Sequence, residues 1–196
     1  MQADLFADDA VQSIPGLRYA PDFLSQQEEL QLLALVRTLP LAPAKYKDYT
    51  ARRQVVSFGS SYDFDTNTLR PGMALDERLL PLRDRVAGWL GVDRDQLVQV
   101  LVAAYAPGTP LGWHRDVPDF ETIAGVSLGN AALLRFRPYP PGAAARRQVV
   151  QLHVAARSIY RLAGASRWAW QHCVPAVKAQ RWSITFRTPR QPARRS

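Results

Sequence analysis

Two side chains that often bind metals lie two residues apart in the segment Trp113–Asp116. If this segment is extended, residues i and i+2 point to the same face, so His114 and Asp116 face one point. An imidazole and a carboxylate on one face provide two of the three ligands of a two-histidine, one-carboxylate metal site. The pair is equally compatible with an exposed histidine and aspartate that bind nothing, so the prediction depends on a third ligand.

Two other histidines are candidates for that third ligand. His172 lies in the apolar segment 168–174, which predicts a strand that runs into the interior of the protein. His153 lies in the alternating segment 149–154, on the same face as Val149, and we assign it a structural or surface role. This leaves His172 as the candidate, far along the chain from Asp116.

The segment 181–187 alternates regularly between polar and apolar residues. With a period of two, one face consists of Arg181, Ser183, Thr185 and Arg187, and the other consists of Trp182, Ile184 and Phe186. We expect the apolar face to pack in the core. If the polar face also turned inward, its two guanidiniums would need anions, because unpaired buried charge is very costly. A dicarboxylate would suit them, since a guanidinium binds a carboxylate through two parallel hydrogen bonds. If the polar face turned outward, it would meet solvent or phosphate.

Two helices are predicted before the strand-rich part of the chain. Ser25 and Glu28 have the spacing of a capping box, and the helix that they start ends before Pro40. A second helix is predicted over Pro81–Trp89, because a proline suits the first helical turn. Both helices therefore precede most of the residues that could do chemistry.

Short segments rich in β-branched and aromatic residues predict strands. They are Gln54–Phe58, Gln99–Tyr105, Ile123–Leu128, Leu133–Arg137, Gln148–Val154, Ser158–Leu162, Trp168–Val174 and Arg181–Arg187. Helices followed by strands indicate an α+β fold rather than a βαβ repeat. About eight strands can close as a double-stranded β-helix, or jelly roll, with the N-terminal helices packed on one sheet and a mouth for a ligand.

The chain has 196 residues and one cysteine, Cys173. Its length predicts a single domain, 19–190, with a flexible arm at 1–18 and a basic tail at 191–196. One cysteine excludes an internal disulfide and a multi-cysteine zinc module. No apolar segment reaches the roughly 18 residues of a membrane span. The start, Met1–Asp4, lacks the basic residues of a secretory signal, so we expect a cytoplasmic protein without a membrane partner.

The segments that carry these patterns together resemble the AlkB family of iron(II)- and 2-oxoglutarate-dependent dioxygenases. In chain order they are Tyr105–Gly108, Trp113–Asp116, Trp170–His172 and Arg181–Arg187. The earlier segment Arg52–Gly59 resembles the part of the family's lid that covers the substrate. The resemblance extends from about residue 15 to residue 190 and implies the jelly-roll fold.

The resemblance implies a role for each matching residue. His114, Asp116 and His172 would bind the iron, and Arg187 would bind the carboxylate beside the keto group of 2-oxoglutarate. The remaining contacts to 2-oxoglutarate would come from Tyr105, Arg181 and Ser183, and contacts to the substrate from Arg53, Phe58, Asp119 and Trp170.

Three positions depart from the family's pattern. Ala103 and Ser183 each replace an asparagine near the cosubstrate, which would reduce the hydrogen bonding around it but keep the charges. Pro118 stands where many members carry an acidic residue that helps read the base. This last departure puts the family's usual choice of methylated base in doubt.

The expected activity is oxidative removal of alkyl groups from nucleobases of DNA or RNA, with Fe(II), 2-oxoglutarate and O2. The formal net charge of +8 supports a polyanionic partner such as an alkylated nucleic acid, and we expect a monomer. The alternatives are the same chemistry in tRNA modification or on a protein, or a nucleic-acid-binding protein whose metal site is vestigial.

Overall fold

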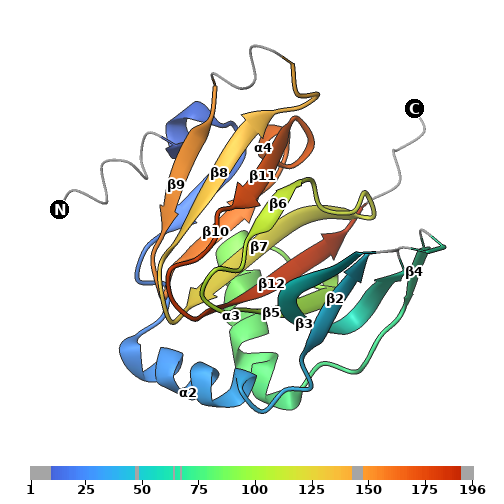
Figure 1. The fold of residues 1–196 in the computed structure, drawn as a ribbon. Coiled ribbons are helices and arrows are strands. Elements are labelled where there is room, and N and C mark those ends of the chain that lie inside the picture. The colour runs from blue at the N-terminus through green and yellow to red at the C-terminus, as the bar shows by residue number, and fades with distance from the viewer. Residues whose placement is uncertain (1–9, 47–48, 64, 67, 143–147, 191–196) are drawn as a thin grey trace.

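Two antiparallel sheets form the body of the computed structural model, which describes residues 10–46, 49–63, 65–66, 68–142 and 148–190 (Figure 1). Within these residues the larger sheet has eight strands in the order β1-β10-β7-β12-β5-β3-β2, with β4 paired to β3. The smaller sheet has the order β6-β11-β8-β9. The α+β fold with a jelly-roll core, predicted from the sequence, is confirmed.

The strands have the following bounds. The larger sheet consists of β1 (Leu17–Ala20), β2 (Ala42–Tyr46), β3 (Tyr49–Asp63), β4 (Thr68–Pro71), β5 (Gln99–Tyr105), β7 (Phe120–Leu128), β10 (Ile159–Leu162) and β12 (Arg181–Pro189). The smaller sheet consists of β6 (Leu111–His114), β8 (Ala132–Pro138), β9 (Val150–Val154) and β11 (Trp170–Val174).

Local sequence signals set the ends of the two long helices. Helix α2 (Gln26–Val36) begins at the predicted capping box, in which the Ser25 hydroxyl accepts from the Glu28 amide and the Glu28 carboxylate accepts from the Ser25 amide. Helix α3 (Leu80–Leu90) ends at Gly91, whose φ of 71° is a left-handed conformation that glycine adopts without strain. A third helix, α4 (Ala165–Trp168), is a single turn just before β11.

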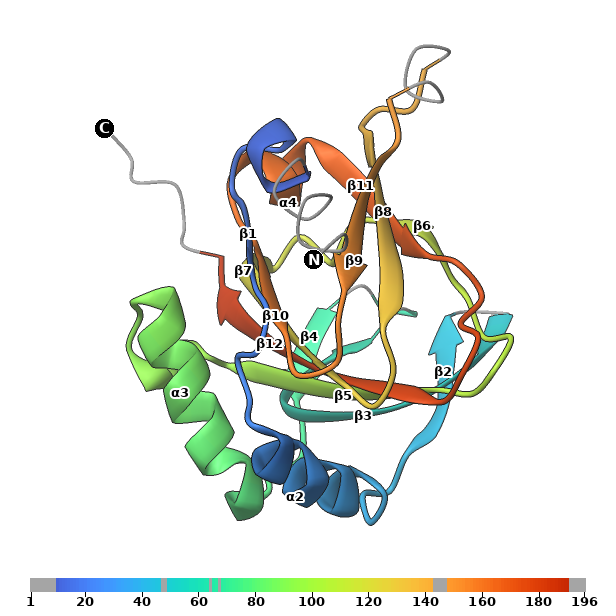
Figure 2. The same ribbon diagram turned by 90° about the vertical axis from the view of Figure 1, so that its left-hand side faces the viewer.

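Helices α2 and α3 cover the outer face of the larger sheet (Figure 2). The apolar residues of β12 point toward them, and a buried cluster joins Ile184 and Phe186 of this strand to Val36 of α2 and Val86 of α3. This arrangement follows from the two periods, because a strand offers every second side chain to one face and a helix offers one apolar stripe. The helix layer thus fixes which face of β12 turns toward the smaller sheet.

A second apolar cluster lies between the two sheets. It includes Phe120 and Ile123 of β7, Phe136 of β8 and Leu152 of β9. The cluster fills only part of the space between the sheets, and a cavity occupies the rest.

Residues 10–18 of the predicted arm pack against the body of the protein. Residues 10–13 are helical, and Ala10, Ile14 and Leu17 are buried in the cluster between the sheets. The apolar residues of this segment are too few and too short in span to reveal a helix or a strand by periodicity. Residues 1–9 and the predicted basic tail at 191–196 lie outside the described residues.

Candidate active site

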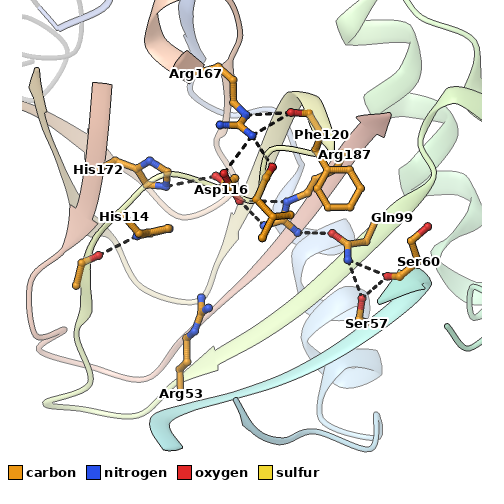
Figure 3. A network of polar contacts seen from close by, with 12 residues as sticks. Arg53, Ser57, Ser60, Gln99, His114, Asp116, Phe120, Arg167, His172 and Arg187 are labelled. Atoms are coloured by element: carbon orange, nitrogen blue, oxygen red, sulfur yellow. Dashed lines mark hydrogen bonds and ion pairs between the residues drawn. The ribbon is translucent and has the colours of Figure 1, made fainter. Parts of the chain in front are cut away.

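The three predicted metal ligands come together where the smaller sheet approaches β12 (Figure 3). His114 ends β6, Asp116 lies in the following loop, and His172 is in β11, directly opposite His114 in the strand register. Each residue has one ligand atom within 4.8 Å of a ligand atom of the other two. His172 Nε2 lies 3.7 Å from Asp116 Oδ2, and the two imidazole centroids are 4.3 Å apart. Two imidazoles and one carboxylate in this arrangement are a ligand set that suits iron(II).

Both histidines are held in the neutral form that binds metals. Burial lowers the pKa of His114, although Asp116 acts in the opposite direction. Burial and the neighbouring His114 lower the pKa of His172 to about 3. His114 Nδ1 lies 2.8 Å from the carbonyl oxygen of Gly112, which can only accept, so Nδ1 carries the proton and Nε2 keeps its lone pair.

Arg187 occupies one oxygen of the Asp116 carboxylate. Its Nη2 and Nε atoms lie 2.7 Å and 3.2 Å from Asp116 Oδ1, while Oδ2 faces His172. Burial alone would raise the pKa of Asp116, but Arg187 and the two histidines outweigh it and hold that pKa well below its usual range. The carboxylate is therefore ionised and can offer Oδ2 to a cation.

Gln99 supports Arg187 from β5, a contact that the sequence analysis did not predict. Gln99 Oε1 accepts from Arg187 Nη1 at 2.8 Å. The amide nitrogen of Gln99 donates in turn to Ser57 Oγ and to the carbonyl oxygen of Ser60, both in β3 (Figure 3). A signal was present, because Gln99 lies on the same face of its strand as Tyr105 by a period of two.

The polar face of β12 lines a cavity of about 680 Å³. Arg181 lies deep in it, with Nη2 donating to Ser127 Oγ at 3.0 Å and its guanidinium 5.1 Å from the centre of the Tyr105 ring. Its Nε is buried and has no hydrogen-bond partner among the described residues. A buried guanidinium with an unused donor is suited to a carboxylate, and Arg187 lies six residues, or three periods of alternation, further along the same face. The residues present therefore fit 2-oxoglutarate, a dicarboxylate.

Small side chains and one tyrosine complete this part of the cavity. Ala103 and Ser183, the two departures from the family's asparagines, are paired in the register of β5 and β12 and both line the cavity. Tyr160 also lines it and lies over Gly125, where an added Cβ would come within 2.4 Å of the tyrosine ring. Burial raises the pKa of Tyr160 to about 12, so its hydroxyl stays protonated and can donate a hydrogen bond.

Of the four predicted substrate contacts, the structure brings only Arg53 to the cavity. Arg53 lines it from β3, with Nη1 3.5 Å from the Tyr105 hydroxyl. Phe58 is on the opposite face of β3, buried in the cluster under the helices, so its assignment is corrected. Asp119 and Trp170 are also not among the lining residues. The main-chain carbonyl of Asp119 binds the Arg190 amide, and Trp170 packs beside the cluster between the sheets.

The charged side chains that line the cavity are almost all cations. Lys45 and Arg115 are exposed lining residues, and Arg53 lies further in. Asp116 is the only acidic residue among the described residues that line the cavity. Trp113 also lines it and stacks on Arg137, with 4.4 Å between the guanidinium carbon and the ring centre.

Comparison with known proteins agrees with this geometry. The family model of the 2OG-Fe(II) oxygenase superfamily matches residues 16–190. The chain is 28% identical over 191 residues to the alkylated DNA repair protein ALKBH8 homolog of Arabidopsis thaliana, covering 87% of this chain and 54% of that protein. It is 27% identical over 170 residues to the tRNA (carboxymethyluridine(34)-5-O)-methyltransferase ALKBH8 of Mus musculus, covering 84% and 25%. The chain thus spans about half of the plant relative and a quarter of the mouse relative.

Two solved structures share the fold. The structure of OsALKBH1 superposes with a TM-score of 0.66 at 15% identity, covering 89% of this chain and 97% of that one. An oxidoreductase of the 2OG-Fe(II) oxygenase family from Burkholderia pseudomallei superposes with a TM-score of 0.63 at 17% identity, covering 95% and 91%. Among the described residues, no helix is long and apolar enough to cross a membrane. Proteins of the matched superfamily use Fe(II), 2-oxoglutarate and O2, and the chain belongs to this 2OG-Fe(II) oxygenase superfamily as an AlkB-like member.

Proposed function

We propose that this protein is a Fe(II)- and 2-oxoglutarate-dependent dioxygenase that oxidatively removes alkyl groups from nucleobases of DNA or RNA. The observation that carries the proposal is the convergence of His114, Asp116 and His172 beside a cavity whose wall holds Arg181 and Arg187. The likeness to an alkylated DNA repair protein homolog supports the substrate class. A nucleic-acid-binding protein with a vestigial metal site would not need this complete set.

The residues divide into two groups by what they would hold. His114, Asp116 and His172 would bind the metal, Arg187 the carboxylate beside the keto group, and Arg181 with Tyr105 the distal carboxylate. The Ser183 hydroxyl would add a hydrogen bond between them. When bound, iron and 2-oxoglutarate would allow O2 to oxidise an alkyl carbon on a nitrogen to a hydroxyalkyl group while 2-oxoglutarate is converted to succinate and CO2, and the hydroxyalkyl group would then leave as an aldehyde.

The protein's own residues position these groups and keep water out. Arg187 fixes the Asp116 carboxylate through Oδ1 and leaves Oδ2 for the metal. Apolar lining residues of both sheets, such as Ile123 and Leu134, exclude water from the inner cavity. The Tyr160 hydroxyl remains a neutral donor beside Arg181 over the physiological pH range.

The charge of the cavity favours a neutral or anionic alkylated base over a cationic one. The two carboxylates of 2-oxoglutarate would offset Arg181 and Arg187, while Lys45, Arg53 and Arg115 add positive charge to a lining in which Asp116 is the one acidic residue among the described residues. A base that is itself a cation would meet like charge in a cavity of low dielectric. The absence of an acidic residue at Pro118 agrees with this preference.

Product analysis by mass spectrometry tests the function directly. Purified protein with Fe(II), 2-oxoglutarate and O2 should produce succinate, the dealkylated base and one aldehyde in equal amounts, and His172→Ala protein should produce none of them. N6-methyladenine is neutral and N1-methyladenine is cationic at neutral pH. The neutral base should therefore have a kcat/KM at least about tenfold higher in matched oligonucleotides, a difference of about 1.4 kcal/mol. If the protein formed no succinate with any substrate in a panel of alkylated DNA, RNA and peptides, the result would contradict the proposal.

A second candidate is the same oxidation on a modified tRNA. The observation that favours it is the likeness to tRNA methyltransferases of Mus musculus and Xenopus tropicalis, although the chain spans only about a quarter of each. Including tRNA in the panel separates the two, and binding at two salt concentrations tests for any nucleic acid, because phosphate contacts weaken as salt rises.

We further propose that residues 19–190 act as a single domain, with residues 10–18 packed on it, in a cytoplasmic monomer. The single cysteine supports the location, since Cys173 is buried and has no disulfide partner in the sequence. Light scattering at two protein concentrations tests the oligomeric state, and a larger mass at the higher concentration would contradict it.

A further inference from the structure

Arg167 is a buried cation close to the metal ligands that sequence motifs did not reveal. It lies in the one-turn helix α4 and is only 2% exposed. Its guanidinium stacks on the neighbouring Trp168, with 4.2 Å between the guanidinium carbon and the ring centre. No carboxylate forms an ion pair with it among the described residues, and burial lowers the pKa of its guanidinium against the nearby charges of Asp116 and Glu121.

Carbonyl groups of the loop after β6 accept the hydrogen bonds of Arg167 (Figure 3). Arg167 Nη2 donates to the carbonyl oxygens of Asp116 at 3.2 Å, Val117 at 2.6 Å and Phe120 at 3.0 Å. Arg167 Nε donates to the same Phe120 carbonyl at 3.2 Å. One side chain therefore holds the two ends of the segment that carries the metal-binding carboxylate.

The position of Arg167 in the chain connects this segment to the other side of the metal site. Helix α4 is followed almost directly by β11, which carries His172. Arg167 thus joins the backbone that presents Asp116 to the backbone that presents His172. Only an arginine has several donors in a rigid planar fork, which lets it bind separate carbonyl groups at once.

We propose that Arg167 is a positioning residue of the metal centre, which sets the place of the Asp116 carboxylate relative to His172 by fixing the backbone of residues 116–120. The proposal rests on the metal role proposed above for His114, Asp116 and His172. It predicts that Arg167 controls metal affinity although it binds no metal itself, as partners of metal ligands do in other proteins.

Neighbouring side chains provide matched controls. Ser166 is also buried in α4, but among the described residues its hydroxyl bonds only to Ala163, with no hydrogen bond to the loop. Ser166→Ala should therefore weaken α4 without releasing residues 116–120. Trp168 Nε1 donates to Glu121 at 2.9 Å, but because Trp168 also stacks on Arg167, Ser166 is the cleaner control.

The experiment measures binding of Co(II) alone to the metal-free full chain by anaerobic titration and visible absorption, beside urea denaturation. Arg167→Met should raise the Kd for Co(II) by about 10- to 100-fold and alter the Co(II) spectrum. Arg167→Lys keeps the charge but cannot reach all three carbonyls, so it should give an intermediate Kd. Ser166→Ala should keep the wild-type Kd and spectrum even where its stability falls.

Two results would overturn the proposal. The first is a wild-type Kd and spectrum in both Arg167 variants. The second is a Kd in Ser166→Ala that rises as far as in the Arg167 variants for the same loss of stability, since Arg167 would then be merely structural. If Arg167→Met does not fold, Arg167→Lys alone decides. Unchanged Co(II) binding in the His172→Ala variant would instead refute the metal role itself. The failure of the Arg167 proposal and the failure of the proposed function are therefore distinguishable.

Discussion

The two faces of strand β12 are equally buried but chemically opposite. Residues 181–188 are all buried. The face toward α2 and α3 carries Trp182, Ile184 and Phe186, and the face toward the smaller sheet carries Arg181, Ser183, Thr185 and Arg187. Because burial is the same on both faces, the difference lies in what each face contacts.

The helix-facing side is complete without any ligand. Ile184 and Phe186 are fully buried and contact other apolar side chains of the sheet and helices. Burial of one such side chain contributes roughly 1.5–3 kcal/mol to folding. This face therefore stabilises the fold and can do no chemistry.

The cavity-facing side is incomplete without a ligand. Arg187 has partners in Asp116 and Gln99, but Arg181 keeps a buried Nε that no described group accepts. A buried donor without a partner costs about 1–3 kcal/mol, and a carboxylate ligand would recover this energy. One strand therefore stabilises the fold through one face and lowers stability on the other in order to bind a ligand.

The largest expected effect comes from removing a metal ligand opposite the polar face. His172→Ala should abolish iron-dependent turnover, a loss greater than the roughly 10- to 100-fold that removal of an outer partner costs. Co(II) titration and succinate formation measure it. His153→Ala is the matched control, because His153 lies in β9 and does not line the cavity. Equal Co(II) binding by both variants would show that the metal site lies elsewhere.

Truncation on the apolar face should affect stability instead of binding. Phe186→Ala should lower the free energy of unfolding by about 3–5 kcal/mol, since it leaves a cavity in a fully buried cluster. Urea denaturation measures this change. The folded fraction should keep its half-saturating 2-oxoglutarate concentration, and a large change in that concentration would mean that the two faces are coupled through the strand.

Removal of the Arg181 side chain should affect 2-oxoglutarate binding instead of stability. Arg181→Met should raise the half-saturating concentration of 2-oxoglutarate by about 10- to 100-fold, because hydrogen bonds to charged groups contribute about 1.5–3 kcal/mol. Without ligand its stability should equal or exceed that of the wild type, since a buried charge with an unused donor is replaced by an apolar group. A marked loss of ligand-free stability would show that Arg181 is already satisfied.

Much of this contrast could be predicted from local sequence. The period of two in 181–187 separated the two faces, the spacing of His114 and Asp116 indicated a shared direction, and Ser25 marked the start of α2. Each of these signals spans a few residues, so it depends only on backbone geometry.

The features that the sequence did not predict depend on contacts between distant segments. Strand alternation puts Gln99 on the same face as Tyr105 but does not indicate its bond to Arg187, and no local pattern indicates that Arg167 bonds the loop of Asp116. Phe58 was predicted to contact the substrate because its segment resembles the lid. Alternation along β3, however, puts its side chain on the opposite face of the strand from Arg53. The short elements β1 and α4 contain too few residues for a period to be recognised.

The smallest expected effect comes from Ser25, at the start of α2, and it tests whether the two faces of β12 are independent. Ser25→Ala removes the side-chain acceptor of the Glu28 amide and should lower the free energy of unfolding by about 1 kcal/mol. Gln27→Ala, in the same exposed first turn, is the control and should have little effect on stability. Co(II) affinity and half-saturating 2-oxoglutarate should not change in either variant.

Combining Ser25→Ala with Arg181→Met sharpens the same test. Changes at independent sites add within about 0.3–0.5 kcal/mol. The free energy of unfolding of the double variant should therefore change by the sum of the two single-variant changes, and its half-saturating 2-oxoglutarate concentration should equal that of Arg181→Met. A larger deviation would mean that the helix layer transmits its stability through β12 to the cavity, because this strand is the element that carries both the apolar contacts of the helices and the arginines of the site.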